Sequence, residues 1–424
     1  MNRRVPVALA LGLLLGSAGE PRAACPEDEP ESSGPFAAEP SLLAFDEALR
    51  DLYAYGDGVD REALLVRLRA AAGGLDRAGL RELLNRAALL YADPHLLVGP
   101  LTDADLNVWP TSADLVVERG ADGRFVVVDV RAGSAADAAA VRPGWTAESV
   151  EGVPLEAAVA GLWEGLVDEI SPAQASWGAT LLVNGRRSGA RRVRFAEGEV
   201  ELANPRELAR AVAARDPVTT RVEDGVAVIR IENALGRDET VAAFDRAMGD
   251  ADRWSALILD LRNTPSGGNT DVARGLLGWF TDAPAPYQMH TIPFIQRTKG
   301  VPRRFVEYVE PRGSRFAGPV VVLGGRWTGS MGEGMVIGMD ALGAHTICSD
   351  LGDLLGGLHS VPLEDLDATL ELGAEALFHV NGTPREEYVC DEPLAAADRG
   401  PQGGDPALDA ALKHLQRPRV TPGR

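Results

Sequence analysis

The sequence predicts a mixed α/β protein of more than one domain, and three observations support this prediction. Apolar residues recur at helical spacing between residues 41 and 92, and short β-type runs follow between about 115 and 200. From residue 225 onward, buried-type strands and amphipathic helices alternate. Such alternation implies a layered α/β domain with a largely parallel sheet. The chain of 424 residues is long enough for two or three domains.

The first segment, residues 1–24, has the pattern of a secretory signal peptide. Two arginines precede an apolar run over residues 5–15, and two alanines before Cys25 offer small residues for cleavage. The run is shorter than the roughly 20 residues that a membrane-spanning helix needs, and no later segment is long and apolar enough. We therefore expect an exported protein, periplasmic or secreted, with no integral membrane segment in its mature chain. Lipid anchoring through Cys25 is the alternative.

Composition limits the partners and the chemistry of the chain. The formal net charge of −20, from 42 basic and 62 acidic residues, argues against nucleic acid or an anionic membrane surface as a partner. Lys299 and Lys413 are the only lysines, so few candidates exist for a catalytic lysine. Three cysteines are too few for a disulfide framework. If Cys25 is removed or lipidated, Cys348 and Cys390 either pair or remain as two free thiols.

A helical N-terminal region is expected over residues 41–100, after a flexible leader (25–40) that is rich in proline, glutamate and serine. Pro94 disfavours helix at the residue before it, so the last helix ends near Ala92 and His95 lies on a loop. Three helices are expected from the apolar stripes Phe45, Leu49 and Leu52; Leu64, Leu65 and Leu68; and Leu80, Leu83, Leu84 and Ala87.

The next region, residues 101–205, consists of short strands. Runs at 115–117 and 125–130 are followed by Gly133-Ser134, a short alanine-rich helix near 138–141 and a Pro-Gly turn. This order resembles a PDZ domain, and such domains bind peptide C-termini by adding the peptide to a sheet as an extra strand. A small β-rich spacer without a ligand is the alternative.

The α/β core is expected over residues 206–395, before a proline- and glycine-punctuated tail at 396–424. Strands are expected at 226–231, 256–261 and 319–323, and helices are expected around 241–248, around 272–280, from 330 to about 342, and near 408–415 in the tail.

Three segments of the core, together with the loop at His95, carry a family resemblance. Residues 256–268 (ALILDLRNTPSGG) resemble a strand that ends in Asp-Leu-Arg before a turn rich in asparagine and glycine. Residues 318–333 resemble a strand leading to a Thr-x-Ser-x-x-Glu nucleophile motif, and residues 381–386 (NGTPRE) resemble a Gly-x-x-x-Glu stretch. Across about residues 41–395 the chain resembles the tail-specific, C-terminal-processing and tricorn-core family of serine peptidases. The resemblance implies a crotonase-like layered α/β core, preceded by a helical N-terminal region and a PDZ-like domain.

The segment around Ser330 has the chemistry that a nucleophile requires. Between a strand and a helix, the serine stands at the carboxyl edge of the sheet, where open α/β sheets bind ligands. The N–H of Met331 points from the helix N-terminus and can donate to a developing oxyanion. The turn at Gly267 and Gly268 can bring a second N–H close. Without the flanking segments, the same serine would be interpreted as a helix N-cap.

The base that activates the serine is implied by the resemblance to one branch of the family. The other branch uses a lysine, and Leu355 stands at the corresponding position here. The tricorn-like branch uses a histidine and a glutamate, which His95 and Glu386 resemble. The implied triad is Ser330, His95 and Glu386, in which the histidine takes the proton and the glutamate orients it. The alternatives are a plain surface histidine at position 95 and Glu387 in place of its neighbour.

The sequence thus predicts an exported, metal-independent serine peptidase that hydrolyses a peptide or protein substrate through an acyl-enzyme on Ser330. No cofactor is expected, because there is no phosphate-binding glycine loop and His345, His359 and His379 have no metal-ligand spacing. One alternative is a non-catalytic peptide-binding protein, because the loop at 349–357 departs from the family pattern. The other is an esterase or amidase that uses the same serine.

Overall fold

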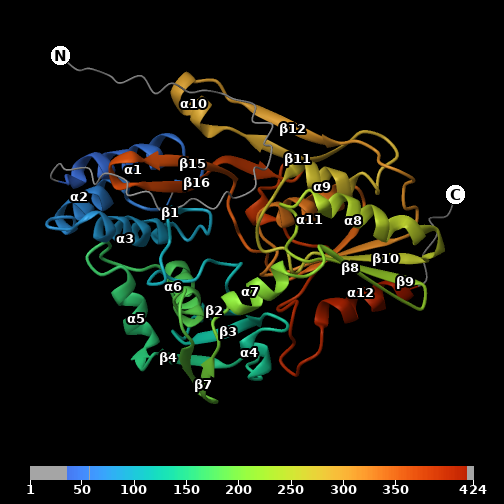
Figure 1. Ribbon diagram of the computed structural model, residues 1–424, viewed down its shortest axis with the longest axis horizontal. Coiled ribbons are helices and arrows are strands. Elements are labelled where there is room, and N and C mark those ends of the chain that lie inside the picture. The colour runs from blue at the N-terminus through green and yellow to red at the C-terminus, as the bar shows by residue number, and fades with distance from the viewer. Residues whose placement is uncertain (1–35, 57, 418–424) are drawn as a thin grey trace, which may run out of the picture. The chain divides into compact units, whose positions relative to one another are not determined.

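The computed structural model describes residues 36–56 and 58–417. The expected signal peptide (1–24), Cys25 and most of the expected leader lie outside these residues. From Ala37 onward the described residues belong to one compact unit, and their three sheets and several helices confirm the predicted mixed α/β class (Figure 1). No helix in this part of the chain is long and apolar enough to cross a membrane.

The three predicted N-terminal helices are present, and their apolar stripes are largely buried. They are α1 (Ala38–Asp51), α2 (Arg61–Ala71) and α3 (Arg77–Ala88). The Asp76 carboxylate caps α3 by accepting a backbone N–H. A 3₁₀ turn, η1 (Leu89–Tyr91), and the left-handed residue Ala92 (φ 51°) end this helical stretch. The chain then passes through the His95 loop into β1 (Leu97–Gly99), as the position of Pro94 predicted.

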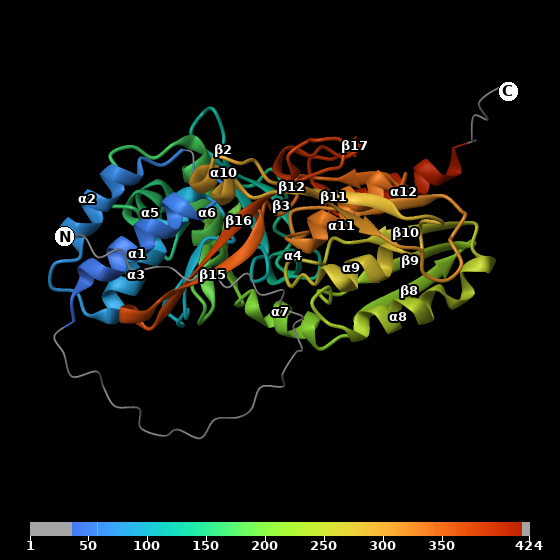
Figure 2. The ribbon, with the colours of Figure 1, turned by 90° about the horizontal axis from the view of Figure 1, so that it is seen from above.

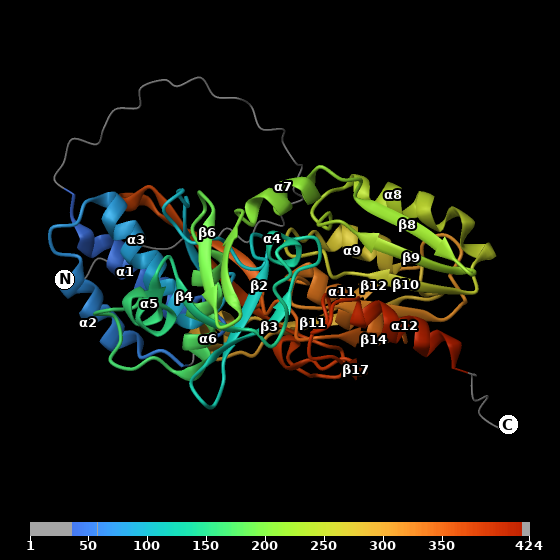
Figure 3. The same ribbon diagram turned by 90° about the horizontal axis from the view of Figure 1, so that it is seen from below.

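An antiparallel sheet follows, with the strand order β2-β3-β4-β6-β7 and β5 paired with β4. Its strands are β2 (Leu115–Arg119), β3 (Phe125–Val130), β4 (Thr146–Val150), β5 (Val153–Pro154), β6 (Arg191–Phe195) and β7 (Gly198–Leu202). Its helices are α4 (Ala135–Ala138), α5 (Leu155–Leu162) and α6 (Pro172–Asn184), and α7 (Arg206–Ala213) leads out of the sheet. Strand β2 forms one edge, and α6 packs against it (Figure 3).

The core sheet has the strand order β17-β14-β13-β10-β9-β8, and all neighbours except the pair β8 and β9 are parallel. Its strands are β8 (Val218–Glu223), β9 (Val226–Ile231), β10 (Ala256–Asp260), β13 (Val320–Gly324), β14 (His345–Cys348) and β17 (Glu392–Pro393). The helices that cover it are α8 (Glu239–Ala247), which continues into η2 (Met248–Arg253), α9 (Thr270–Leu277), α11 (Met331–Ala341) and α12 (Pro406–Gln416).

Apolar side chains cover both faces of this sheet, as expected for parallel strands. In β10, Leu257 and Leu259 belong to the core under α8, α9 and α11, whereas Ile258 belongs to the core under α12. Figure 1 shows this layering, with α12 on the side of the sheet opposite to α8, α9 and α11. The continuous apolar run at 256–259 therefore marks a strand buried on both faces.

A third sheet joins the N-terminal helices to the core. It has the order β1-β16-β11-β12, with β15 paired with β16, and all of its pairs are antiparallel. The strands are β11 (Ala285–Thr291), β12 (Arg304–Val309), β15 (Gly357–Leu363) and β16 (Ala368–Phe378), with α10 (Pro293–Lys299) and η3 (Glu364–Leu366) between them. Figure 2 shows β15 and β16 beside α1 and α3. Strand β1, which follows the His95 loop, pairs with β16 in this sheet, and the loop lies beside Leu355, just before β15.

Cys348 and Cys390 form a disulfide, with their Cα atoms 5.9 Å apart. The sequence left this pairing open. The bond connects the end of β14 to the chain after η4 (Arg385–Glu387).

Candidate active site at the start of helix α11

Ser330 lies on a sharp turn between β13 and α11. Its backbone angles are φ 54° and ψ −117°, a conformation that is costly for any residue other than glycine. A strained serine between strand and helix presents its hydroxyl group at the edge of the sheet, as in nucleophile elbows. The residue is half-buried. The structure thus places Ser330 at the carboxyl edge of the core sheet, where the sequence analysis expected it.

The turn after β10 packs against the turn that carries Ser330. The N–H of Gly329 donates to the Thr264 carbonyl at 3.0 Å, and the Thr328 hydroxyl donates to the Leu261 carbonyl at 3.0 Å. A Cβ atom on Gly332 would lie 2.5 Å from Thr264 Oγ1. The two turns therefore fit only with glycine at this position, and their contact holds the serine turn in place.

Gly268 lies directly against the first residue of α11. A Cβ atom on Gly268 would lie 2.4 Å from Met331 Cβ and 3.4 Å from the Met331 backbone nitrogen. Gly267, at φ 75°, has the left-handed conformation that turns the chain toward this contact. Neither the N–H of Met331 nor that of Gly268 donates to an acceptor within the described residues. The Gly268 backbone thus lies against the first residue of α11, whose N–H is at a helix N-terminus, the kind of position that suits an oxyanion.

The Glu333 carboxylate connects the serine turn to the loop at 349–357. It accepts the N–H groups of Ser330 at 2.6 Å, Asp353 at 3.0 Å and Leu354 at 3.2 Å. Its side chain is 1% exposed. Burial raises the pKa of Glu333 to about 8, and the positive charge of Arg385, 3.7 Å away, opposes that rise. Glu333 therefore supports the first helical turn and ties it to the loop at 349–357.

His95 is held by the same loop. Its imidazole is 7% exposed, and its Nδ1 lies 3.0 Å from the carbonyl oxygen of Leu355. A carbonyl can only accept, so Nδ1 carries the proton and Nε2 keeps the lone pair. Burial lowers the pKa of His95 to about 4, and the charge of Arg385 acts in the same direction. The ring is therefore neutral at neutral pH. Leu355, the residue at the lysine position of the other branch, contributes its carbonyl group instead of a side chain.

Asp93 organises the histidine loop, a role that the sequence analysis missed. Its carboxylate accepts the N–H groups of His95 at 2.9 Å and Leu355 at 3.2 Å, and the Tyr53 hydroxyl at 2.9 Å. Burial raises the pKa of Asp93 to about 7. The Asp-Pro-His order in the sequence was the available signal, because an aspartate before proline commonly accepts hydrogen bonds from a turn.

Arg385 joins the serine turn to the loop at 349–357, and sequence reasoning missed it as well. Its guanidinium donates to the Ser330 carbonyl at 3.2 Å and to the Leu354 carbonyl. The same group forms the ion pair with Glu333 and its charge reaches His95. Its side chain is 5% exposed. Nothing in the motif at 381–386 distinguished this arginine, because its importance depends on contacts with two distant segments.

Glu386 lies on η4 and is exposed. Within the described residues it makes no hydrogen bond to His95, whose Nδ1 is already bonded to the Leu355 carbonyl. Burial, followed by the negative charge of Glu386, raises the pKa of Tyr55, so the carboxylate lies near that ring. Glu387 is exposed as well. The two lysines of the chain are exposed on α10 and α12, away from these contacts.

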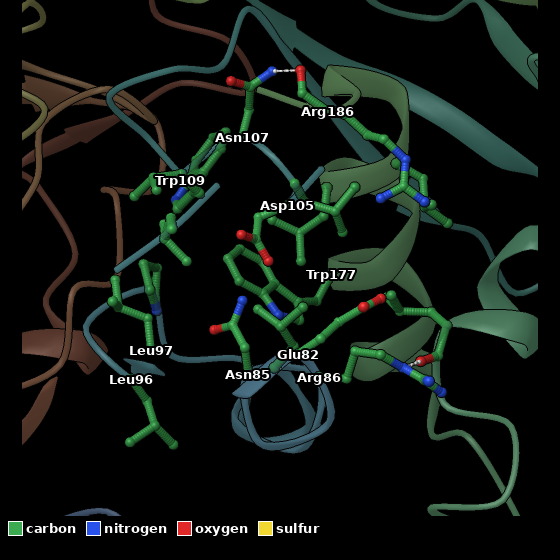
Figure 4. Close-up of a pocket in the computed structure, with 18 of the residues that line it drawn as sticks. Glu82, Asn85, Arg86, Leu96, Leu97, Asp105, Asn107, Trp109, Trp177 and Arg186 are labelled. Carbon is green, nitrogen blue, oxygen red and sulfur yellow. Dashed lines mark hydrogen bonds between the residues drawn. The ribbon is translucent and has the colours of Figure 1, made fainter. Parts of the chain in front are cut away.

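Two cavities adjoin the histidine loop. One, of about 300 Å³, lies between α3, α6 and the chain around Asn107, and Figure 4 shows Trp109 and Trp177 among its lining side chains. The other, of about 290 Å³, lies between β2, α6 and residues 351–353. Pro94 and the two tryptophans line both cavities. Space for a bound group therefore exists on the His95 side of the serine turn.

The free edge of β2 is occupied by side chains of α6. Ser176, Thr180 and Asn184 lie four residues apart on one face of the helix. Thr180 Oγ1 both accepts from and donates to the backbone of one β2 residue, at 3.0 and 2.9 Å. Within β2, the backbone groups bound by the three side chains belong to the alternate residues Leu115, Val117 and Arg119, and Asn184 Oδ1 also accepts the N–H of Asp114 just before the strand. These are the groups that an added peptide strand would need.

No protein-family model matches the chain, and no curated protein matches it in sequence. Solved structures do match it in fold. Mature CPAF in complex with lactacystin is 16% identical, with a TM-score of 0.56, and the match covers 89% of this chain and 97% of that one. The photosystem II D1 C-terminal processing protease is 15% identical, with a TM-score of 0.53 and coverage of 84% and 93%. A putative peptidase from Parabacteroides merdae is 13% identical, with a TM-score of 0.52 and coverage of 90% and 97%.

These matches extend over nearly the full length of each solved chain, so they include the N-terminal helices, the antiparallel sheet and the core together. The protein therefore has the fold of the tail-specific and C-terminal-processing serine peptidases.

Proposed function

We propose that this protein is an exported serine peptidase that hydrolyses peptide bonds through an acyl-enzyme on Ser330. The observation that carries the proposal is the strained turn at Ser330, next to the Met331 N–H at the start of α11 and to the glycine turn that packs against it. The fold supports it, because the solved structures of similar fold include a D1 C-terminal processing protease and CPAF.

In the proposed mechanism, His95 Nε2 accepts the proton of the Ser330 hydroxyl as the oxygen attacks the peptide carbonyl. The Leu355 carbonyl holds the ring in the required tautomer. The same histidine then donates its proton to the leaving amine, and water repeats the attack on the acyl-enzyme. A histidine of low pKa is a weak base but a strong acid, which favours the second transfer.

We propose Glu386 as the third member of the catalytic triad, where its negative charge acts on His95 without a hydrogen bond. The imidazolium that forms at His95 is disfavoured by the positive charge of Arg385. The proposal requires the carboxylate on the next residue to reduce that electrostatic cost without a hydrogen bond to the ring. In this arrangement the Leu355 carbonyl orients the histidine and Glu386 stabilises its charged form.

The proposed oxyanion hole consists of the N–H groups of Met331 and Gly268, with Gly267 setting the turn. The Met331 N–H belongs to the first residue of α11, at the positive end of the helix, and the Gly268 backbone lies in tight contact with that residue. Removal of one such donor typically raises the barrier by about 3 kcal/mol.

Export is proposed from the signal-peptide pattern at residues 1–24 and from the Cys348–Cys390 disulfide, since disulfides persist mainly outside the cytosol. We propose a crotonase-like core at 206–395. We propose that the PDZ-like region at 101–205 acts as a wall of the substrate site, because α6 already occupies its strand edge.

Labelling with a fluorophosphonate probe tests the proposal. The mature protein should be labelled, and peptide mapping should find the adduct on Ser330. The Ser330→Ala variant should lose both labelling and peptide hydrolysis, and its thermal transition should stay within a few degrees of the parent. Labelling that survives in this variant contradicts the assignment. Hydrolysis of small esters but of no peptide would instead identify an esterase.

A further inference from the structure

Two histidines and a glutamate from distant segments meet beside the core sheet. His345 begins β14, Glu392 begins β17 and His414 lies on α12. One ligand atom of each residue lies within 4.8 Å of those of the other two. The sequence analysis expected no metal site, because His345, His359 and His379 have no metal-ligand spacing along the chain. The fold brings them together through α12, which packs against β14.

Both histidines have a buried ring nitrogen without a hydrogen-bond partner in the described part of the chain. These atoms are His345 Nε2 and His414 Nδ1. The nearest carboxylate oxygen of Glu392 lies 3.8 Å from His345 Nε2, too far for a hydrogen bond. A buried polar atom that lacks a partner is destabilising and calls for a ligand or another explanation.

The other nitrogen of His345 lies close to a carboxylate. Its Nδ1 is 3.2 Å from Asp391 Oδ2, which also accepts the Thr346 N–H at 3.0 Å. A proton on Nδ1 would face this carboxylate and leave the Nε2 lone pair for a ligand. Metal-binding histidines usually have this second partner, because it sets the tautomer and makes the ligand nitrogen more basic.

We propose that His345, Glu392 and His414 bind one Zn²⁺ ion, with water as the fourth ligand. Two imidazole nitrogens and one carboxylate oxygen are a common zinc ligand set, whereas Ca²⁺ and Mg²⁺ prefer oxygen ligands alone. The two rings are stacked, with centroids 3.8 Å apart and planes 13° from parallel. Binding therefore requires the rings to turn about χ2, a torsion with broad minima.

The site would stabilise the fold and take no part in peptide hydrolysis. His345 pairs with Val321 near the start of β13, at the amino edge of the sheet, whereas Ser330 follows the carboxyl edge. The ion would fasten α12 to β14 and β17. Glu392 follows Cys390 by two residues, so the metal and the disulfide would hold the same segment of chain.

Metal titration of the mature protein tests the proposal. After chelator treatment and dialysis, it should bind one equivalent of Zn²⁺ by calorimetry. Co²⁺ should give the strong visible absorption of a tetrahedral site. His414→Ala and Glu392→Gln should each weaken Zn²⁺ binding at least tenfold. His359→Ala, which removes an exposed histidine of β15, should leave it unchanged.

Two measurements keep the test decisive if a variant folds poorly. Asp391→Asn leaves the three ligands in place and should weaken binding about 10- to 100-fold. Zn²⁺ should raise the Tm of the parent and of His359→Ala, but not that of His414→Ala. Affinity unchanged in both His414→Ala and Glu392→Gln would overturn the proposal, as would the weak spectrum of octahedral Co²⁺. Fluorophosphonate labelling of Ser330 should persist in the metal-free protein. The result of the zinc test is therefore independent of the proposed peptidase activity.

Discussion

Replacing Gly268 with alanine tests whether the contact between the glycine turn and helix α11 forms the oxyanion hole. The new Cβ atom would lie 2.4 Å from Met331 Cβ, far inside van der Waals contact, and neither atom belongs to a flexible side-chain end. The turn must therefore move away from the helix. Such a movement separates the two backbone donors while leaving Ser330 and His95 in place.

The expected loss of kcat follows from the contribution of one hydrogen-bond donor to the stability of the transition state. Loss of one oxyanion-hole hydrogen bond lowers kcat about 100- to 1,000-fold, or about 3 to 4 kcal/mol. Overpacking at a buried contact costs about 1 to 3 kcal/mol of stability, so Tm should fall by several degrees while the protein stays folded. KM should change little, because the donors act chiefly on the transition state.

The assay is steady-state hydrolysis of a fluorogenic peptide, with thermal unfolding measured on the same preparations. Gly249→Ala is the matched control, because its Cβ would meet nothing within 4 Å and its φ is not in the left-handed region. It should keep both kcat and Tm. A folded Gly268→Ala protein with near-normal kcat would refute the assignment of the oxyanion hole, and an equal loss in Gly249→Ala would show that the effect is not local.

Three further predictions concern the base, its partner and the disulfide. Since the pKa of His95 is lowered to about 4, kcat/KM should fall only as pH drops through that value and should be level from about pH 5.5 to 8; a midpoint near 6.5 would contradict this burial. Glu386→Gln should lower kcat less than His95→Ala does. A larger loss of kcat in Glu387→Gln than in Glu386→Gln would identify Glu387 as the charge partner of His95. Replacing Cys348 and Cys390 with serine opens a loop of 42 residues and should cost about 4 kcal/mol of stability in thermal or urea unfolding, whereas an unchanged midpoint would refute a stabilising role.

Local patterns predicted the elements that form the site. The apolar run at 256–259 predicted a doubly buried strand, and Pro94 predicted the end of the helix before His95. The segment around Ser330 predicted a strand-to-helix junction, which the structure confirms. Each of these features depends on neighbours within a few residues, so the sequence contains the necessary information.

Features that depend on distant segments could not be predicted in this way. Arg385 is important because it connects the serine turn to the loop at 349–357, and the Leu355 carbonyl matters because this loop packs against His95. The sequence identified residue 355 by its side chain, which takes no part in the hydrogen bond. The cluster of His345, Glu392 and His414 is a similar case, since only the packing of α12 on β14 brings the ligands together.

The hydrogen bonds between α6 and β2 affect how activity can be controlled. A peptide that added to β2 would have to displace side chains of Ser176, Thr180 and Asn184, which are tethered next to the strand at a high effective concentration. Breaking five hydrogen bonds at about 1 kcal/mol each would cost about 5 kcal/mol, which weakens a ligand by more than a thousandfold. A free C-terminal peptide at micromolar concentration should therefore neither activate nor inhibit the enzyme through this edge. Inhibitors are better directed at the cavities beside Trp109 and Trp177, where space exists without such competition.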